Sequence, residues 1–218
     1  MAQVSLILGA KKIDRLIPNA DEYLSNYHSD TGYLYHGYRL KSSPDRIVPE
    51  DLAVTLLMNS RVGCKAFKGL IDYGDKINLG RLPEKALEDT SLMERQQVAS
   101  LIAEVAKIPG FATSVATKLL HKKRPALIPV LDNQAIFGAY MYAAWPKKPA
   151  RQDSNKDFDK ICCALEWIHY DLNRSENAPA WSALQGMEPN RTRIHIFDSV
   201  WWIYFRTNQP VKPLGESS

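Results

Sequence analysis

The spacing of the apolar residues is the feature that most limits how this chain can fold. Along most of its 218 residues they recur at intervals of three and four, which is the period of one face of an α-helix. The pattern predicts helices at 51–59, 62–73, 92–107, 112–122, 132–144, 156–172 and 191–206. Proline, glycine, asparagine and charged residues gather between them and predict loops at 74–83, 145–154 and 174–179. We therefore expect an all-α fold.

The first 47 residues follow a less regular pattern. Five tyrosines occur there in a weak alternation that would suit a short hairpin: Tyr23, Tyr27, Tyr33, Tyr35 and Tyr38. They are either a packing layer or an aromatic platform for a nucleobase. We predict that residues 1–47 form a divergent segment packed on a helical domain at 48–208, and that 209–218 form a flexible tail.

The composition narrows the class of protein. Hydrophobic residues make up 45% and charged residues 24%, as in ordinary globular proteins, and no apolar run is long enough to predict a membrane span. The N-terminal residues do not resemble a secretory signal, so we predict a cytoplasmic protein. Cys64 stands alone, and Cys162 and Cys163 are adjacent, which makes them a poor disulfide pair. Three thiolates are too few for an all-cysteine iron–sulfur cluster, and none is expected.

Positive charge is concentrated in one stretch. The net charge is +4, yet the residues from 107 to 124 contain no acid and carry His121 and five cations, which are Lys107, Lys118, Lys122, Lys123 and Arg124. Such a run has two interpretations. It is either a solvated helix end or a contact surface for nucleic acid, and the residues around it decide between them.

The run begins at a tight turn between two predicted helices. Pro109 stops the first helix because its ring fixes φ, and Gly110 permits a backbone conformation that other residues resist. The second helix then begins near Ala112. Its first N–H groups have no partner inside the helix and offer a site for an anion; they belong to Ala112, Thr113 and Ser114. Exposed amides beside lysines suit close approach to a phosphodiester.

These residues resemble a known family. Residues 108–112 read Ile-Pro-Gly-Phe-Ala, and residues 128–132 read Ile-Pro-Val-Leu-Asp. This is similar to the helix-hairpin-helix DNA glycosylase superfamily, in which an apolar-Pro-Gly-apolar-Gly hairpin precedes a catalytic aspartate by about two dozen residues. Adenine glycosylases show a similar Pro-apolar-Leu-Asp-polar run. The match covers 93–144, about a quarter of the chain. It implies a two-lobed helical fold, with Asp132 at the mouth of a pocket between the lobes.

The resemblance also implies binding partners, and the sequence departs from the family's pattern at three points. It implies a monomer that binds double-stranded DNA through Gly110, Ala112, Thr113, Ser114, Lys118, Lys122, Lys123 and Arg124. The only cofactor that it admits is a monovalent cation at the hairpin carbonyls. Ala112 replaces the second hairpin glycine, and Ser114 stands where bifunctional members carry a Schiff-base lysine. The cysteine-rich cluster loop of some relatives is absent.

Asp132 is the candidate catalytic residue. Breaking an N-glycosidic bond develops positive charge on the deoxyribose, and a nearby carboxylate stabilises that charge and aligns water. A simple helix N-cap is the alternative role of this aspartate. Because Ser114 supplies no amine, we expect base removal without strand cleavage. Lys118, one turn later, is a phosphate contact, a solvated lysine or a substitute amine nucleophile.

A second group of residues is a candidate lining of the base pocket. It comprises Asn133, Gln134, Asp198, Trp202 and Tyr35. The helix at 191–206 places His195, Asp198 and Trp202 on one stripe, which also suits a core helix with a buried acid.

The sequence does not identify the base that would be removed. A modified or mispaired base, removed in DNA repair, fits the chemistry. A modified cytosine in phage DNA, removed in antiviral defence, is one specific candidate. The rival functions are a non-catalytic, structure-specific DNA-binding protein, which Ala112 favours, and a helical protein unrelated to nucleic acid.

Overall fold

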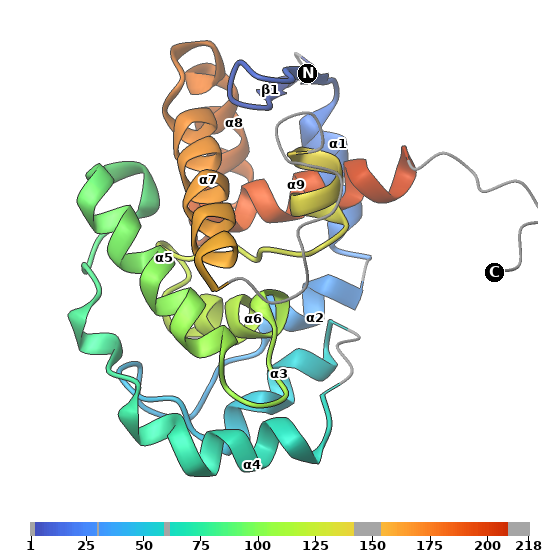
Figure 1. Cartoon of the computed structure of the whole chain (residues 1–218). Coiled ribbons are helices and arrows are strands. Elements are labelled where there is room, and N and C mark those ends of the chain that lie inside the picture. The colour runs from blue at the N-terminus through green and yellow to red at the C-terminus, as the bar shows by residue number, and fades with distance from the viewer. Residues whose placement is uncertain (1–2, 30, 59–61, 142–153, 209–218) are drawn as a thin grey trace, which may run out of the picture.

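The computed structural model describes residues 3–29, 31–58, 62–141 and 154–208, and most of them are helical (Figure 1). The upper half in Figure 1 contains β1 (Leu6–Leu8), β2 (Arg15–Ile17), α1 (Ala20–Tyr27), α7 (Ser154–Asn173), α8 (Ala178–Met187) and α9 (Arg193–Thr207). The lower half contains α2 (Thr31–Gly37), α3 (Ala53–Leu56), α4 (Cys64–Tyr73), α5 (Leu92–Ala106) and α6 (Thr113–Lys123). The prediction of a mostly helical chain is confirmed. None of the described helices has the length and apolar character that a bilayer crossing requires.

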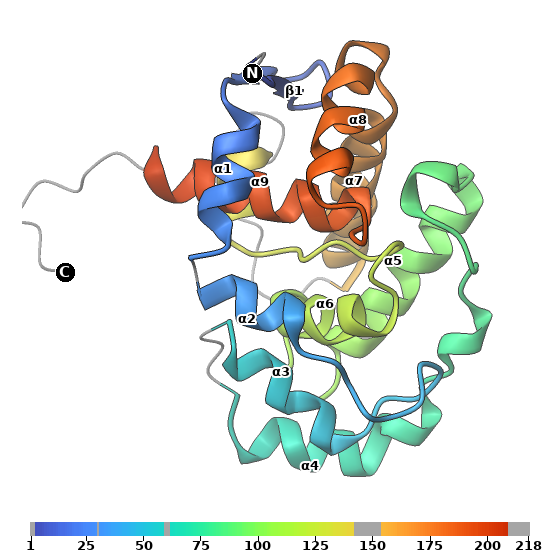
Figure 2. The ribbon, with the colours of Figure 1, turned by 180° about the vertical axis from the view of Figure 1, so that it is seen from behind.

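The chain therefore begins in one half, crosses to the other for α2 to α6, and returns for α7 to α9 (Figures 1 and 2). Five of the seven predicted helices agree with the observed bounds to within two residues. The exceptions are 51–59, where the structure has α3 after a short 3₁₀ turn at Pro49–Leu52, and 132–144. Helix α8 was not predicted and begins inside the predicted loop at 174–179. Pro179 favoured a loop in the sequence, but it lies in the first turn of α8, where proline fits because its missing N–H has no partner there in any case.

The tyrosine-rich segment is helical, and the prediction of a hairpin there was wrong. Tyr23 and Tyr27 lie in α1, one turn apart, and Tyr35 lies in α2. The actual strand pair precedes them, with Leu6 opposite Ile17 in an antiparallel register. Helix α1 packs across α9, so this segment is part of the fold (Figure 2).

The strand pair is attached to α7 and α8 by buried polar groups. The Asp171 carboxylate accepts N–H bonds from Gly9 at 2.6 Å and Ala10 at 3.0 Å, and the Tyr140 hydroxyl donates to it at 2.7 Å. Burial nevertheless raises the pKa of Asp171 to about 6. Asn177 bonds to both the N–H and the carbonyl of Ile7, each at 2.8 Å. The amino-terminal strands are thereby fixed to the carboxy-terminal helices.

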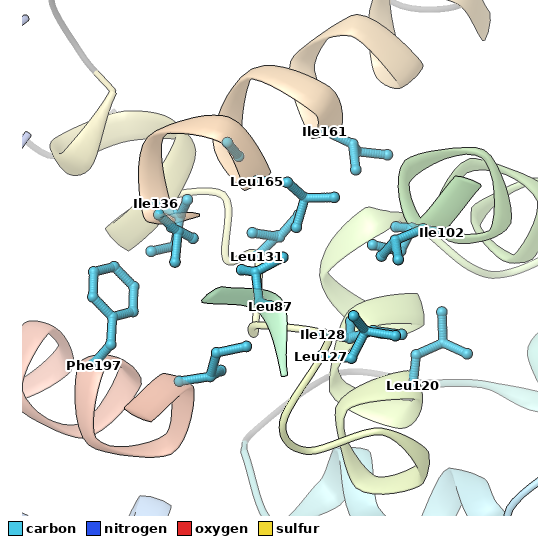
Figure 3. Packing of buried hydrophobic residues seen from close by; sticks show 14 of the residues in the cluster. Leu87, Ile102, Leu120, Leu127, Ile128, Leu131, Ile136, Ile161, Leu165 and Phe197 are labelled. Carbon is cyan, nitrogen blue, oxygen red and sulfur yellow. The ribbon is translucent and has the colours of Figure 1, made fainter. Parts of the chain in front are cut away.

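One hydrophobic core joins the two halves. Figure 3 shows Ile128 and Leu131 surrounded by apolar side chains of other elements, among them Ile102, Leu120, Leu165 and Phe197. All six are fully buried. Burying a side chain of this size contributes about 1.5–3 kcal/mol to stability. This core holds the segment 128–131 in place directly before Asp132.

The segment after Asp132 departs from a regular helix. The sequence predicts an α-helix over 132–144, but the structure has a π-helix, η5 (Ala135–Tyr140). Its wider turns appear in the bonds from Phe137 N to Asp132 O at 3.1 Å and from Ala139 N to Gln134 O at 2.8 Å. Single π-turns are rare and often occur at functional sites. The end of the predicted helix, 142–144, and nearly all of the predicted loop at 145–154 lie outside the described residues.

The turn between α5 and α6 docks on α4. Gly110 has a φ of +88°, and a Cβ there would lie 2.5 Å from the backbone N of Ala66. Gly69 faces the same turn, where a Cβ would lie 2.7 Å from the Pro109 carbonyl oxygen. Gly110 is thus required by the packing of α4 on the turn.

We predict that Gly110→Ala lowers the free energy of unfolding by at least about 2 kcal/mol, because a Cβ at positive φ is strained and this one also meets the α4 backbone. Gly186→Ala is the matched control, since nothing lies within 4 Å of a Cβ in α8, and it should gain about 0.5–1 kcal/mol. Urea unfolding measures both. Equal stability of the two variants would contradict the docking of the turn.

Candidate functional site

The start of α6 is an uncapped helix end at the hairpin. Ala112 is the N-cap, with extended backbone and no side-chain hydrogen bond to the helix. Within the described part of the chain, the first N–H groups of α6, on Thr113 and Ser114, have no hydrogen-bond partner. Ala112 is exposed, and Thr113 and Ser114 are half-buried. The arrangement leaves room for an anion at the positive end of the helix dipole.

Two exposed lysines flank this turn. Lys107 is the C-cap of α5, three residues before Gly110. Lys65 lies in α4, and its backbone carbonyl carbon would be 2.9 Å from a Cβ on Gly110. The sequence indicated Lys107 as part of the basic run, but it missed Lys65. Nothing in the sequence places α4 against the turn, except that Gly69 and Gly110 are residues that allow close backbone approach.

Lys123 and Arg124 do not face outward as the sequence predicted. The Lys123 ammonium is buried and forms an ion pair with Asp51 at 2.8 Å, and it also donates to Ser42 Oγ at 2.5 Å. Arg124 forms an ion pair with Asp45 at 2.6 Å and donates to the Pro44 carbonyl at 2.9 Å. Their charges connect the end of α6 to residues 42–51. This placement argues against phosphate contacts by either residue.

Lys122 is also turned toward the protein. Its ammonium donates to the backbone carbonyls of Tyr35 at 2.8 Å and His36 at 3.0 Å, and it lies 5.0 Å from the Tyr35 ring centroid. Burial lowers the pKa of Lys122 to about 8. The basic run is therefore divided between an exposed part at the turn and an inward-facing part at the far end of α6.

Asp132 lies at the start of η5. Its Oδ1 accepts N–H bonds from Gln134 at 2.8 Å and Ala135 at 3.0 Å, so the aspartate does serve as a cap. The side chain is half-buried, and within the described residues its Oδ2 has no hydrogen-bond partner. One oxygen fixes the orientation of the carboxylate while the other is available to a ligand. Asn133 and Gln134 are both exposed beside it.

Three side chains fix the backbone that leads to Asp132. Leu131 N donates to Thr117 Oγ1 at 3.0 Å, and His121 Nδ1 bonds the Ile128 carbonyl at 2.7 Å. From α9, Asp198 Oδ2 accepts from Val130 N at 3.2 Å. Sequence reasoning did not single out Thr117, because its role depends on a partner from another segment.

Lys118 lies near Asp132. It is 6% exposed, and burial lowers its pKa while the negative charge of Asp132 acts in the opposite direction. Its backbone carbonyl accepts a hydrogen bond from the Tyr35 hydroxyl. The residue implied as a phosphate contact is therefore a mostly buried neighbour of the candidate carboxylate.

The remaining pocket candidates do not gather around Asp132 as a group. Tyr35 is fully buried, which rules out stacking of a base on its ring without rearrangement. Asp198 is occupied by Val130 N, and burial holds its pKa well above the usual range. Trp202 is half-buried near the end of α9, where Arg206 lies over its ring at 5.9 Å. Tyr35 and Asp198 are packing and positioning residues in this structure.

The described residues do not form a metal site, and one cysteine of α7 is a weak nucleophile. They contain no group of three or more histidine, cysteine or acidic side chains arranged to hold a metal ion. The three cysteines are free, and burial raises the pKa of Cys162 to about 11. A thiol with a raised pKa is a poor nucleophile at neutral pH.

Comparison with known proteins places the chain in a family. The model of a family of unknown function (DUF6308) matches residues 17–204, from the second strand to α9. The protein belongs to this family. No curated protein and no solved structure matches the chain. The match includes α1 and α2, so the tyrosine-rich segment is part of the family's domain.

We predict that Lys123→Met lowers the free energy of unfolding by about 3–5 kcal/mol, because it leaves the buried Asp51 carboxylate without its cation. Lys107→Met is the matched control and should stay within about 0.5 kcal/mol of the wild type, as expected for an exposed side chain. Denaturant titration measures both. A stable Lys123→Met variant would return this lysine to the candidates for DNA contact.

Proposed function

We propose that the protein is a monofunctional DNA glycosylase that removes a modified or mispaired base and leaves an abasic site. The observation that carries the proposal is the placement of Asp132. Its carboxylate is oriented by two backbone N–H bonds, lies near the buried Lys118, and follows a segment that α6 and α9 hold by hydrogen bonds. The same α6 begins at the glycine turn, so the hairpin and the carboxylate belong to one rigid unit.

The chemistry assigned to Asp132 is electrostatic. As the N-glycosidic bond breaks, the sugar acquires positive charge, and the carboxylate oxygen not used for capping stabilises it and aligns a water molecule. The carboxylate does not have to reorient, because Gln134 N and Ala135 N hold its other oxygen. Preorganised charge of this kind is usually the largest contribution to such catalysis.

Water is the proposed nucleophile. Ser114 occupies the position at which bifunctional members of the superfamily that the hairpin resembles carry an amine, and it lies half-buried near the start of α6. Lys118 has a lowered pKa and a carboxylate neighbour, which are also the properties of an amine nucleophile. If the enzyme also cuts the strand, Lys118 is therefore the residue that would supply the amine nucleophile.

DNA is proposed to bind at the hairpin end of α6. The N–H groups of Thr113 and Ser114 would contact one phosphate, and the exposed Lys65 and Lys107 would contact its neighbours. The proposed partner is double-stranded DNA, and the protein is proposed to act as a monomer in the cytoplasm. The target base leaves the base stack before its glycosidic bond is cleaved. A monovalent cation at the hairpin carbonyls remains part of the proposal. A modified cytosine in phage DNA is one specific substrate within it, which would make the protein an antiviral defence factor.

A non-catalytic, structure-specific DNA-binding protein is the second candidate. The docking of Gly110 on α4 favours it, because this turn already serves a structural purpose. Ala112 also adds a methyl group where the hairpins that this turn resembles have glycine. Both candidates require DNA binding, and only release of free base separates them.

We predict that Asp132→Asn lowers the rate of base release by about 100- to 1000-fold, because the side chain keeps its shape but loses its charge. DNA affinity should be retained or slightly raised, since one negative charge near the phosphates is removed. Mass spectrometry of bases released from damaged and phage DNAs measures the rate. Asp75→Asn, at an exposed position, is the matched control and should match the wild type.

The same reaction tests the nucleophile. The wild type should leave abasic sites that are cut only by alkali, and borohydride should trap no protein–DNA adduct. A trapped adduct that disappears in Lys118→Ala would show that Lys118 is the nucleophile, and the proposed mechanism would change from hydrolysis to lyase chemistry. Full base release by Asp132→Asn would remove the carboxylate from the mechanism. Release of no base from any DNA, with DNA binding intact, would favour the second candidate.

We predict that replacing Lys65 and Lys107 together by glutamine weakens DNA binding and lowers the slope of log affinity against log salt by about two, one for each phosphate that is no longer neutralised. The matched control replaces Lys11 and Lys12 by glutamine and should keep the wild-type slope. These two lysines are exposed between β1 and β2, in the other half of the molecule. Fluorescence anisotropy at several salt concentrations measures both. Unchanged binding in the first variant would remove the turn from the DNA interface.

A further inference from the structure

A cavity of about 610 Å³ lies at the end of α6 that is opposite the hairpin. The end of α2, the end of α6 and the residues that lead into α9 enclose it. Its size is within the range of pockets that bind small molecules, about 300–1,000 Å³. Its charged lining residues are Arg39, Lys122, Lys123 and Arg191, and three histidines line it as well.

The lining carries positive charge and no carboxylate. Two of its cations have acidic partners behind the wall, Lys123 with Asp51 at 2.8 Å and Arg191 with Glu188 at 3.0 Å. Lys122 instead bonds two neutral carbonyls, which leaves its charge uncompensated by these contacts. An ammonium has three N–H donors, so one remains beyond these two bonds. The wall is therefore complementary to an anion.

Three histidine rings lie together in the same wall. His36 stacks on His195 with ring centroids 3.6 Å apart, and His121 lies 5.3 Å from His36. Burial lowers the pKa of His121 to about 4 and that of His195 to about 2, so both are neutral at pH 7. Neutral rings avoid the repulsion that three cations would cause. Two of their nitrogens already have partners, His121 Nδ1 with the Ile128 carbonyl and His195 Nε2 with Arg191. The buried Nδ1 of His36 has no hydrogen-bond partner within the described residues.

We propose that this cavity binds the phosphoryl group of a small ligand or of a DNA end. Lys122 and Arg39 supply the charge and the N–H donors for it. A phosphoryl group fits because its several acceptor oxygens match the N–H donors of an arginine and a lysine, with which they form charge-assisted hydrogen bonds. The ligand is either a free nucleotide or the terminal phosphate of a strand.

This site is separate from the one proposed for base excision. Neither Asp132 nor any residue at the start of α6 lines the cavity. The inference therefore does not rest on glycosylase activity, and Asp132→Asn is expected to bind phosphate as the wild type does. Failure of one proposal leaves the other standing.

The test is a titration of the full chain with phosphorylated and unphosphorylated probes. Calorimetry and the shift in thermal unfolding measure binding. The probes are inorganic phosphate, the four deoxynucleoside monophosphates, the matching nucleosides, and one oligonucleotide with and without a 5′-phosphate. We expect phosphorylated probes to bind and nucleosides not to bind. Arg39→Gln should weaken binding at least about tenfold, and Lys122→Gln should do the same. Arg46→Gln, an exposed arginine outside the cavity, is the matched control and should leave binding unchanged.

The outcomes identify the ligand source. Binding of the mononucleotides supports a free nucleotide, and binding of only the phosphorylated oligonucleotide supports a strand end. Lys122 also holds the Tyr35 and His36 carbonyls, so its variant can lose stability as well as affinity; Arg39→Gln separates the two effects because the Arg39 side chain is exposed. Absence of binding by every phosphorylated probe would overturn the proposal. Unaltered affinity in Arg39→Gln would overturn it as well.

Discussion

The hydrogen bonds between α6 and the segment 128–131 are the interactions on which the rest of the structure depends. Thr117 and His121 bind the backbone at Leu131 and Ile128, while Asp198 reaches Val130 from α9. The segment is buried between the two halves of the molecule, where an unpaired N–H or carbonyl is costly. Its position is therefore strongly constrained, and the orientation of the residue that follows it is constrained with it.

The far end of α6 holds a different part of the chain. Lys123 and Arg124 draw residues 42–51 onto the helix through ion pairs, and Lys122 bonds the backbone at the end of α2. These inward contacts turn a basic run into the wall of a cavity. The number of cations in the run does not by itself indicate a DNA-binding surface. The ion-pair partner and the burial of each side chain decide whether its charge faces the protein or the solvent. Lys65 and Lys107, at the hairpin turn, are exposed.

The two ends of α6 thus present different surfaces. One end offers unpaired backbone amides beside a turn that Gly110 makes possible, and the other offers side-chain cations and neutral histidine rings. Asp132 is connected to the first end through α6, because Thr117 of this helix accepts a hydrogen bond from the N–H of Leu131, the residue before Asp132. The π-helix after Asp132 widens the turn in which its capping oxygen accepts two N–H bonds. A rigid helix of 11 residues relates all of these features.

The sequence by itself determined most helices, the turn at Pro109 and Gly110, and Asp132 as the residue that begins an element, because these depend on short-range periodicity and local backbone preferences. Only the tertiary structure decided that Tyr35 is buried, that Lys123 pairs with Asp51, and that Lys65 lies beside the turn. It also made a π-helix of a segment that reads as an ordinary helix. Each of these outcomes depends on a partner from a distant segment, and a local pattern carries no information about which surfaces the core brings together.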